Sequence, residues 1–70
     1  MRYGELTRKL TRLGYQLRRQ AKGGHEVWGN FETRKRTIIP RHEAKDISQG
    51  TLRSILRDLG LTEQDLEGRP

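Results

Sequence analysis

The first apolar residues of the chain recur at the spacing of an α-helix. Four of them are separated by three or four positions: Tyr3, Leu6, Leu10 and Leu13. This spacing places their side chains on one face and predicts an amphipathic helix over residues 3–13. Gly14 follows directly, and a glycine in this place favours a left-handed residue that ends the helix, with Tyr15 contacting Leu10.

After this helix the pattern changes to a period of two. Residues 15–21 alternate between a mostly apolar and a polar set of side chains, which is typical of a half-buried strand. We expect a second strand over residues 25–31, whose apolar members are Val27, Trp28 and Phe31. The β-branched residues at 37–39 predict a short third strand, and Pro40 is expected to end it because proline has no amide hydrogen to donate.

The Gly23-Gly24 pair predicts a tight turn between the first two strands. Two-residue turns that fit the twist of a sheet require positive φ, which glycine adopts readily. If these glycines are the central residues, Lys22 and His25 close the hairpin on one face. In this register Glu26 points away from His25. The side chains expected on the buried face are Leu17, Ala21 and Trp28, and Arg19 is expected opposite Trp28. Those expected on the open face are Arg18, Lys22, His25 and Val27.

A second helix is marked at both ends. Ser48 is its predicted N-cap, with Ile47 placed to contact Leu52, and Gly60 closes it. Its apolar stripe consists of Leu52, Ile55, Leu56 and Leu59. Thr62 is placed to cap one further helical turn through residue 66.

The order of elements is therefore helix, three antiparallel strands, helix, in a single domain of residues 1–70 with a core over about residues 3–61. Both helices are expected on one face of the sheet, with the other face open. This α+β, α-β-β-β-α order resembles the double-stranded-RNA-binding fold.

Composition points to a polyanionic partner. The 70 residues include 15 Lys plus Arg and 9 Asp plus Glu, a formal charge of +6, which favours nucleic acid. Cysteine is absent, which excludes disulfides and thiolate chemistry and favours the cytoplasm. No apolar stretch is long enough to span a membrane, so no membrane partner is expected.

Few catalytic chemistries fit these residues. Two histidines without a spaced carboxylate cluster do not predict a metal site, and no glycine-rich phosphate loop or cofactor motif is present. RNA, however, carries its own nucleophile. A histidine can take the proton of a ribose 2′-hydroxyl, and nearby cations can stabilise the charge that develops on the phosphate. His25 and the surrounding Lys and Arg residues meet that requirement.

Several motifs together resemble the HicA family of bacterial toxins. They are Lys22-Gly23-Gly24-His25 followed by Trp28, then Ile39-Pro40-Arg41-His42, Lys45-Asp46-Ile47, and the run from Gly50 to Asp58. The resemblance implies a double-stranded-RNA-binding-like fold and an mRNA interferase of a type II toxin-antitoxin pair. It also implies neutralisation by a HicB-type antitoxin, and we expect the toxin alone to be a monomer.

The resemblance maps the catalytic histidine onto His25. Family members often have Ser and His where this chain has Gly24 and Glu26, so any contribution of that Ser and that His is absent here. His42 is interpreted as a structural residue or phosphate contact in preference to a general acid, and Trp28 as a core residue in preference to a base-stacking one. The residues expected to bind RNA are Arg18, Lys22, Gly23, Gly24, Arg34, Lys35, Arg36 and His42.

Two other functions stay open at this point. The same cations without a reaction would make a non-catalytic RNA-binding module. A DNA-binding protein is disfavoured because neither predicted helix has the basic, base-reading N-terminal half that such proteins use.

Overall fold

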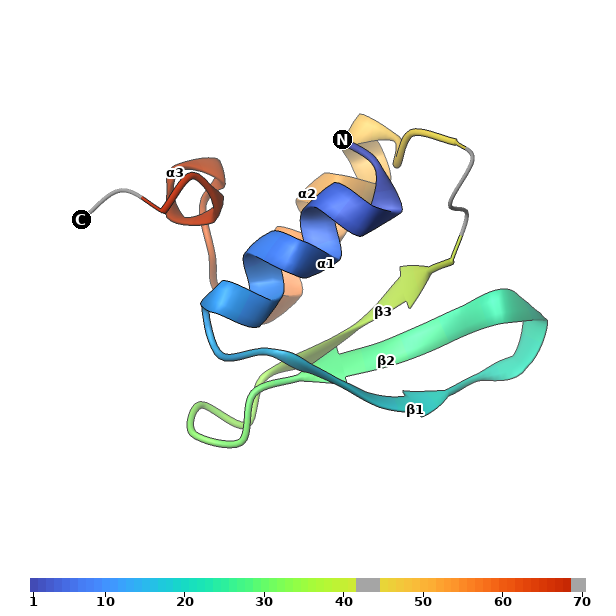
Figure 1. The fold of residues 1–70 in the computed structure, drawn as a ribbon, viewed down its shortest axis with the longest axis horizontal. Coiled ribbons are helices and arrows are strands. Elements are labelled where there is room, and N and C mark those ends of the chain that lie inside the picture. The colour runs from blue at the N-terminus through green and yellow to red at the C-terminus, as the bar shows by residue number, and fades with distance from the viewer. Residues whose placement is uncertain (42–44, 69–70) are drawn as a thin grey trace.

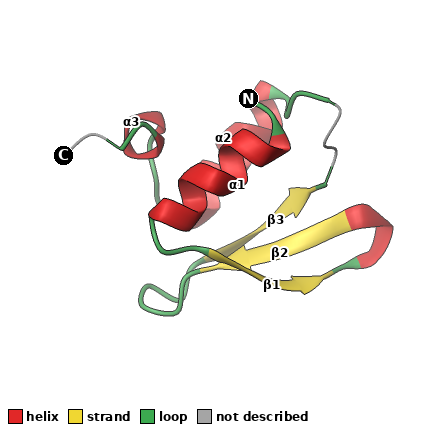
Figure 2. Ribbon diagram, viewed as in Figure 1, coloured by secondary structure: helices red, strands yellow, loops and turns green. Residues whose placement is uncertain are grey.

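A computed structural model describes residues 1–41 and 45–68 of the chain. One antiparallel sheet has the strand order β1-β2-β3, and α1 and α2 lie over the same face of it (Figure 1). The opposite face carries no helix among the described residues, so the predicted α+β arrangement is confirmed (Figure 2). The elements are α1 (Tyr3–Arg12), β1 (Gln16–Gln20), a 3-10 turn η1 (Lys22–Gly24), β2 (His25–Gly29), β3 (Arg36–Pro40), α2 (Gln49–Leu59) and α3 (Glu63–Leu66).

The core lies between the sheet and the two long helices. Leu6 and Leu10 of α1 and Ile39 of β3 are completely buried. The remaining core residues are Tyr15, Trp28, Ile47, Leu52, Ile55, Leu56, Leu59 and Leu66. The predicted helix stripes are therefore core, except that Tyr3 and Leu13 are only partly buried at the edge of the cluster.

The helix ends form as their local sequence predicts. Gly14 adopts a φ of 96°, and the amide of Tyr15 donates to the carbonyl of Leu10 at 3.0 Å, which closes α1. The side chain of Ser48 accepts a hydrogen bond from the amide of Thr51 at 3.2 Å and caps α2. These bonds satisfy backbone groups that have no partner within the helices.

The predicted helix ends also form in the C-terminal part of the fold. Gly60 ends α2 in the left-handed conformation, with a φ of 68°. Thr62 and Asp65 form a reciprocal capping box at the start of α3, which ends at Leu66 as predicted.

The turn between β1 and β2 differs from the prediction. It contains three residues, Lys22–Gly24, and the amide of Ala21 donates to the carbonyl of His25 at 2.7 Å. Ala21 and His25 therefore close the hairpin, and the predicted Lys22 to His25 closing pair is wrong. Gly23 and Gly24 do adopt positive φ, of 70° and 76°, but a pair of such residues fits either loop length.

A β-bulge in β1 also changes the predicted register. Leu17 pairs with Trp28 and Arg19 pairs with Val27, so Arg18 is an extra residue. Arg19 therefore shares the open face with Val27 and does not lie opposite Trp28. Without the bulge, the three-residue turn would place Arg18 opposite Trp28, on the face covered by the helices. Burying an unpaired guanidinium is costly, so the bulge keeps both arginines in solvent.

The second and third strands have different ends from those predicted. β2 stops at Gly29, and Phe31 lies in the loop to β3 with 65% of its surface exposed. β3 extends from Arg36 to Pro40, and Pro40 pairs with His25. Proline is tolerated there because β3 is an edge strand.

Candidate functional site

His25 is the first residue of β2, directly after the turn, and it is exposed to solvent. Its ring Nδ1 lies 3.0 Å from the carbonyl oxygen of Lys22. A carbonyl oxygen only accepts hydrogen bonds, so in the neutral ring this contact favours the proton on Nδ1. The lone pair on Nε2 is then available to accept a proton from another molecule.

Backbone hydrogen bonds hold this turn in place. The Ala21 to His25 bond closes it on the β1 side, and the amide of Arg41 donates to the carbonyl of Gly24 at 2.9 Å on the β3 side. Pro40 lies opposite His25 in the sheet. The imidazole is thus attached to a backbone that is paired on both sides.

A pocket of about 380 Å³ adjoins the imidazole. Its described lining residues are His25, Pro40, Lys45, Asp46, Ile47, Ser48 and Thr51. Lys45 is exposed and precedes α2. The N-terminal end of a helix carries a partial positive charge, so the pocket combines an imidazole, an ammonium group and the positive end of α2. Asp46 opposes this charge, but it forms an ion pair with Arg2 at 3.7 Å.

The cations of the hairpins form a second site. A groove of about 460 Å³ is lined by Arg18, Arg19, Val27, Gly29, Asn30, Phe31, Arg34, Lys35 and Arg36. It therefore brings together four of the predicted RNA-binding cations, and Arg19 joins them. Sequence reasoning missed Arg19 because the bulge that turns it outward has no local sequence signal.

The two sites lie at opposite ends of the sheet. Figure 1 shows the turn at residues 22–24 at one end and the loop at residues 30–35 at the other. A strand rises about 3.3 Å per residue, so His25 and Gly29 at the two ends of β2 are about 13 Å apart. The predicted set is thus divided: Lys22, Gly23 and Gly24 adjoin the imidazole, and the arginine groove is separate. His42 lies outside the described residues.

The pocket beside His25 contains residues that sequence reasoning did not assign to it. The sequence pattern places Lys45 in a motif without assigning it a role, and it assigns Ser48 only the role of N-cap. The available signal is a basic residue three positions before a helix N-cap, because helix N-termini attract anions. Their proximity to His25 depends on the end of β3 meeting the start of α2, which no local pattern states.

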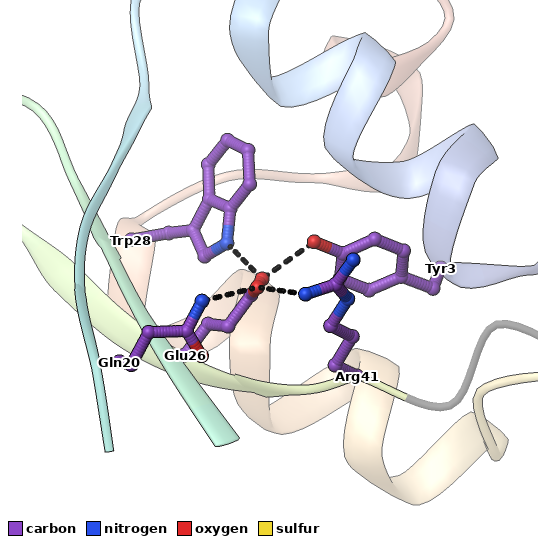
Figure 3. A network of polar contacts seen from close by, with 5 residues as sticks. All are labelled: Tyr3, Gln20, Glu26, Trp28 and Arg41. Atoms are coloured by element: carbon purple, nitrogen blue, oxygen red, sulfur yellow. Dashed lines mark hydrogen bonds and ion pairs between the residues drawn. The ribbon is translucent and has the colours of Figure 1, made fainter. Parts of the chain in front are cut away.

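Glu26 points to the opposite face from His25, as expected, and is only 1% exposed. Its carboxylate accepts hydrogen bonds from the Tyr3 hydroxyl at 2.5 Å and from the Trp28 indole at 3.0 Å (Figure 3). Gln20 at 3.5 Å and Arg41 at 3.9 Å complete the network. Trp28 is 7% exposed within it, which confirms Trp28 as a core residue.

Two absences concern only the described residues, 1–41 and 45–68. No group of three or more His, Cys, Asp or Glu is placed among them to hold a metal ion. No helix in this part of the chain is long and apolar enough to cross a membrane.

The fold and the open face define a small α+β protein of the double-stranded-RNA-binding-like type, with an exposed histidine and a basic groove on the helix-free side of the sheet. Residues 3–61 match the family model of the HicA toxin of bacterial toxin-antitoxin. The chain therefore belongs to the HicA toxin family, and membership implies an antitoxin partner and an RNA target. No significant match was found among curated proteins or among solved structures.

Proposed function

We propose that the protein is a metal-independent endoribonuclease that cleaves mRNA, with His25 as its general base. The observation that carries the proposal is the contact between Nδ1 of His25 and the carbonyl of Lys22. In the neutral ring, this contact favours the tautomer that has its proton on Nδ1 and a lone pair on Nε2, on an exposed residue beside a pocket. An imidazole in this state can accept the proton of a ribose 2′-hydroxyl.

In the proposed reaction, Nε2 of His25 takes the 2′-hydroxyl proton and the 2′-oxygen forms a bond to the adjacent phosphorus. The bond from phosphorus to the 5′-oxygen of the next nucleotide breaks, and that oxygen takes a proton from water. The resulting hydroxide takes the proton from the imidazolium, which restores the neutral base. The products are a 2′,3′-cyclic phosphate and a 5′-hydroxyl. Because the RNA supplies the nucleophile, the protein supplies only a base, charge stabilisation and a binding surface.

The charge stabilisation comes from the other side of the pocket. Lys45 and the N-terminus of α2, capped by Ser48, line the same pocket as His25. A phosphorane gains negative charge on its oxygens as the 2′-oxygen attacks, and preorganised positive groups stabilise that charge. Lys22, the first residue of the turn, adds a further cation.

The antitoxin would act on the same surface. A HicB-type antitoxin that covers the His25 pocket with acidic groups would block RNA and associate quickly with a chain of net charge +6. The toxin acts on mRNA in the cytoplasm once this cover is lost.

Incubation of RNA with the purified protein in EDTA tests the proposal. We expect wild-type protein to produce fragments with 2′,3′-cyclic phosphate ends, and His25→Ala to produce none above background. Arg8→Ala is the matched control, because Arg8 is an exposed cation on α1. It is expected to cleave like wild type.

Two results would overturn the proposal. Cleavage by His25→Ala at the wild-type rate would remove the histidine from the mechanism. RNA that stays intact with the wild-type protein, while both proteins bind it equally, would favour the non-catalytic RNA-binding module.

A further inference from the structure

Phe31 is an exposed aromatic residue within the basic groove, and the proposed reaction does not use it. It is 65% exposed, whereas Trp28 in β2 is 7% exposed. The guanidinium carbon of Arg18 lies 3.7 Å from the centroid of the Phe31 ring. One ring face is therefore covered by a cation, and the exposed fraction leaves the other face accessible to a ligand.

The loop that carries Phe31 is held by its own hydrogen bonds. The side chain of Asn30 accepts from the amide of Glu32 at 2.7 Å, and the amide of Asn30 donates to the carbonyl of Lys35 at 3.0 Å. The amide of Arg34 donates to the carbonyl of Asn30 at 2.8 Å. Phe31 thus lies in an ordered turn, so a ligand that contacts it does not have to order the loop.

The groove around Phe31 indicates what that ligand is. Five cations line it, Arg18, Arg19, Arg34, Lys35 and Arg36, and no carboxylate does so among the described residues. Its volume of about 460 Å³ lies within the range of about 300–1,000 Å³ for small-molecule sites. A ligand with a flat face for Phe31 and several negative charges for the arginines matches this lining.

We propose that Phe31, backed by Arg18, is a stacking site for one unpaired nucleobase, and that the groove holds the flanking phosphates of single-stranded RNA. The bases of a duplex are stacked on one another, and their faces cannot reach an aromatic side chain. The groove lies along the same strand as His25, so one single-stranded segment can occupy both. This inference rests on RNA as the substrate, as in the proposed function, and adds that the substrate is unpaired at this position.

The test measures binding in the His25→Ala background, where the RNA stays intact. Phe31→Ala is expected to weaken the binding of a single-stranded oligoribonucleotide by about 5- to 100-fold, the usual effect of removing one stacked base. Phe31→Tyr is expected to bind like the parent, because it keeps the ring. Ile38→Ala is the matched control, since Ile38 is 55% exposed and lies outside the groove.

Two further arms identify the ligand group. The parent protein should bind an oligonucleotide with an abasic unit at the stacked position more weakly than it binds the intact oligonucleotide. The Phe31→Ala variant should bind these two oligonucleotides with equal affinity. Phe31→Ala should not change the binding of a duplex of the same sequence. If Phe31→Ala weakens the binding of duplex and single-stranded RNA equally, or weakens the binding of neither, the proposal is overturned. Weakened binding of the antitoxin with unchanged RNA binding would assign Phe31 to the protein partner and overturn it as well.

These results are separable from the catalytic proposal. If the wild-type protein cleaves no RNA but Phe31→Ala weakens single-strand binding, the stacking site stands and the endoribonuclease does not. If cleavage depends on His25 but Phe31→Ala does not change the affinity for single-stranded RNA, the endoribonuclease proposal stands and the stacking site does not.

Discussion

The side chains of His25 and Glu26 lie on opposite faces of β2, although the two residues are adjacent in the chain. Glu26 is 1% exposed and hydrogen-bonded to Tyr3 of α1, and His25 is exposed beside the pocket at the start of α2. The alternation of a strand thus separates a carboxylate from the proposed RNA-binding surface. Glu26 therefore serves to hold α1 against the sheet.

Removal of the Glu26 carboxylate is expected to destabilise the fold. Glu26→Ala leaves the Tyr3 hydroxyl and the Trp28 indole without their buried acceptor. We expect the free energy of unfolding to fall by about 3 kcal/mol, the usual order for removing one charged member of a buried hydrogen-bond network. Urea denaturation followed by circular dichroism measures this loss.

Glu32→Ala is the control for this measurement, because Glu32 is an exposed carboxylate in the loop before β3. It is expected to change the free energy of unfolding by less than about 0.5 kcal/mol. Equal stability of Glu26→Ala and wild type would show that the network does not stabilise the fold.

The helices and their ends could be predicted from sequence because each signal acts within one turn. Gly14, Ser48 and Gly60 each satisfy backbone groups a few residues away, and each forms the predicted cap. The hairpin register could not be predicted in the same way. Gly23-Gly24 fits a turn of two or three residues, and the bulge at Arg18 follows from the distant helices that cover one face of the sheet.

The sequence likewise predicts one part of the candidate site and not another. The exposure of His25 follows from its place beside a glycine turn. Its separation from the arginine groove and its proximity to Lys45 depend on how β3 and α2 are placed in space. Such contacts between distant segments have no counterpart in a local pattern.

Arg19 is expected to contact RNA phosphate, since the bulge turns it into the groove with Arg18 and Arg36. Each phosphate neutralised on a single strand contributes about 0.7 to the slope of log affinity against log salt concentration. Arg19→Gln in the His25→Ala background should therefore reduce that slope by about 0.7. Fluorescence anisotropy at several salt concentrations gives the slope.

Arg53→Gln controls for the change in net charge, because Arg53 is an exposed cation of α2 that does not line the groove. Its slope is expected to match that of the parent. If both variants reduce the slope equally, the effect of Arg19 is one of overall charge and the groove does not bind phosphate.

Lys45 is expected to act on the reaction more than on binding. It shares the pocket with His25, and in the proposed reaction its ammonium group stabilises the charge that appears on the phosphorane oxygens. Because that charge develops in the transition state, Lys45→Ala should lower kcat by about 10- to 100-fold and change KM much less.

Two variants serve as controls. Lys45→Arg keeps the charge and should retain more of kcat. Arg53→Ala removes a cation of α2 that lies outside the pocket, so it should leave both constants unchanged. Steady-state cleavage of a fluorescent oligoribonucleotide separates the two constants. A rise in KM with an unchanged kcat would make Lys45 an RNA-binding residue and leave the α2 N-terminus as the main source of charge stabilisation beside His25.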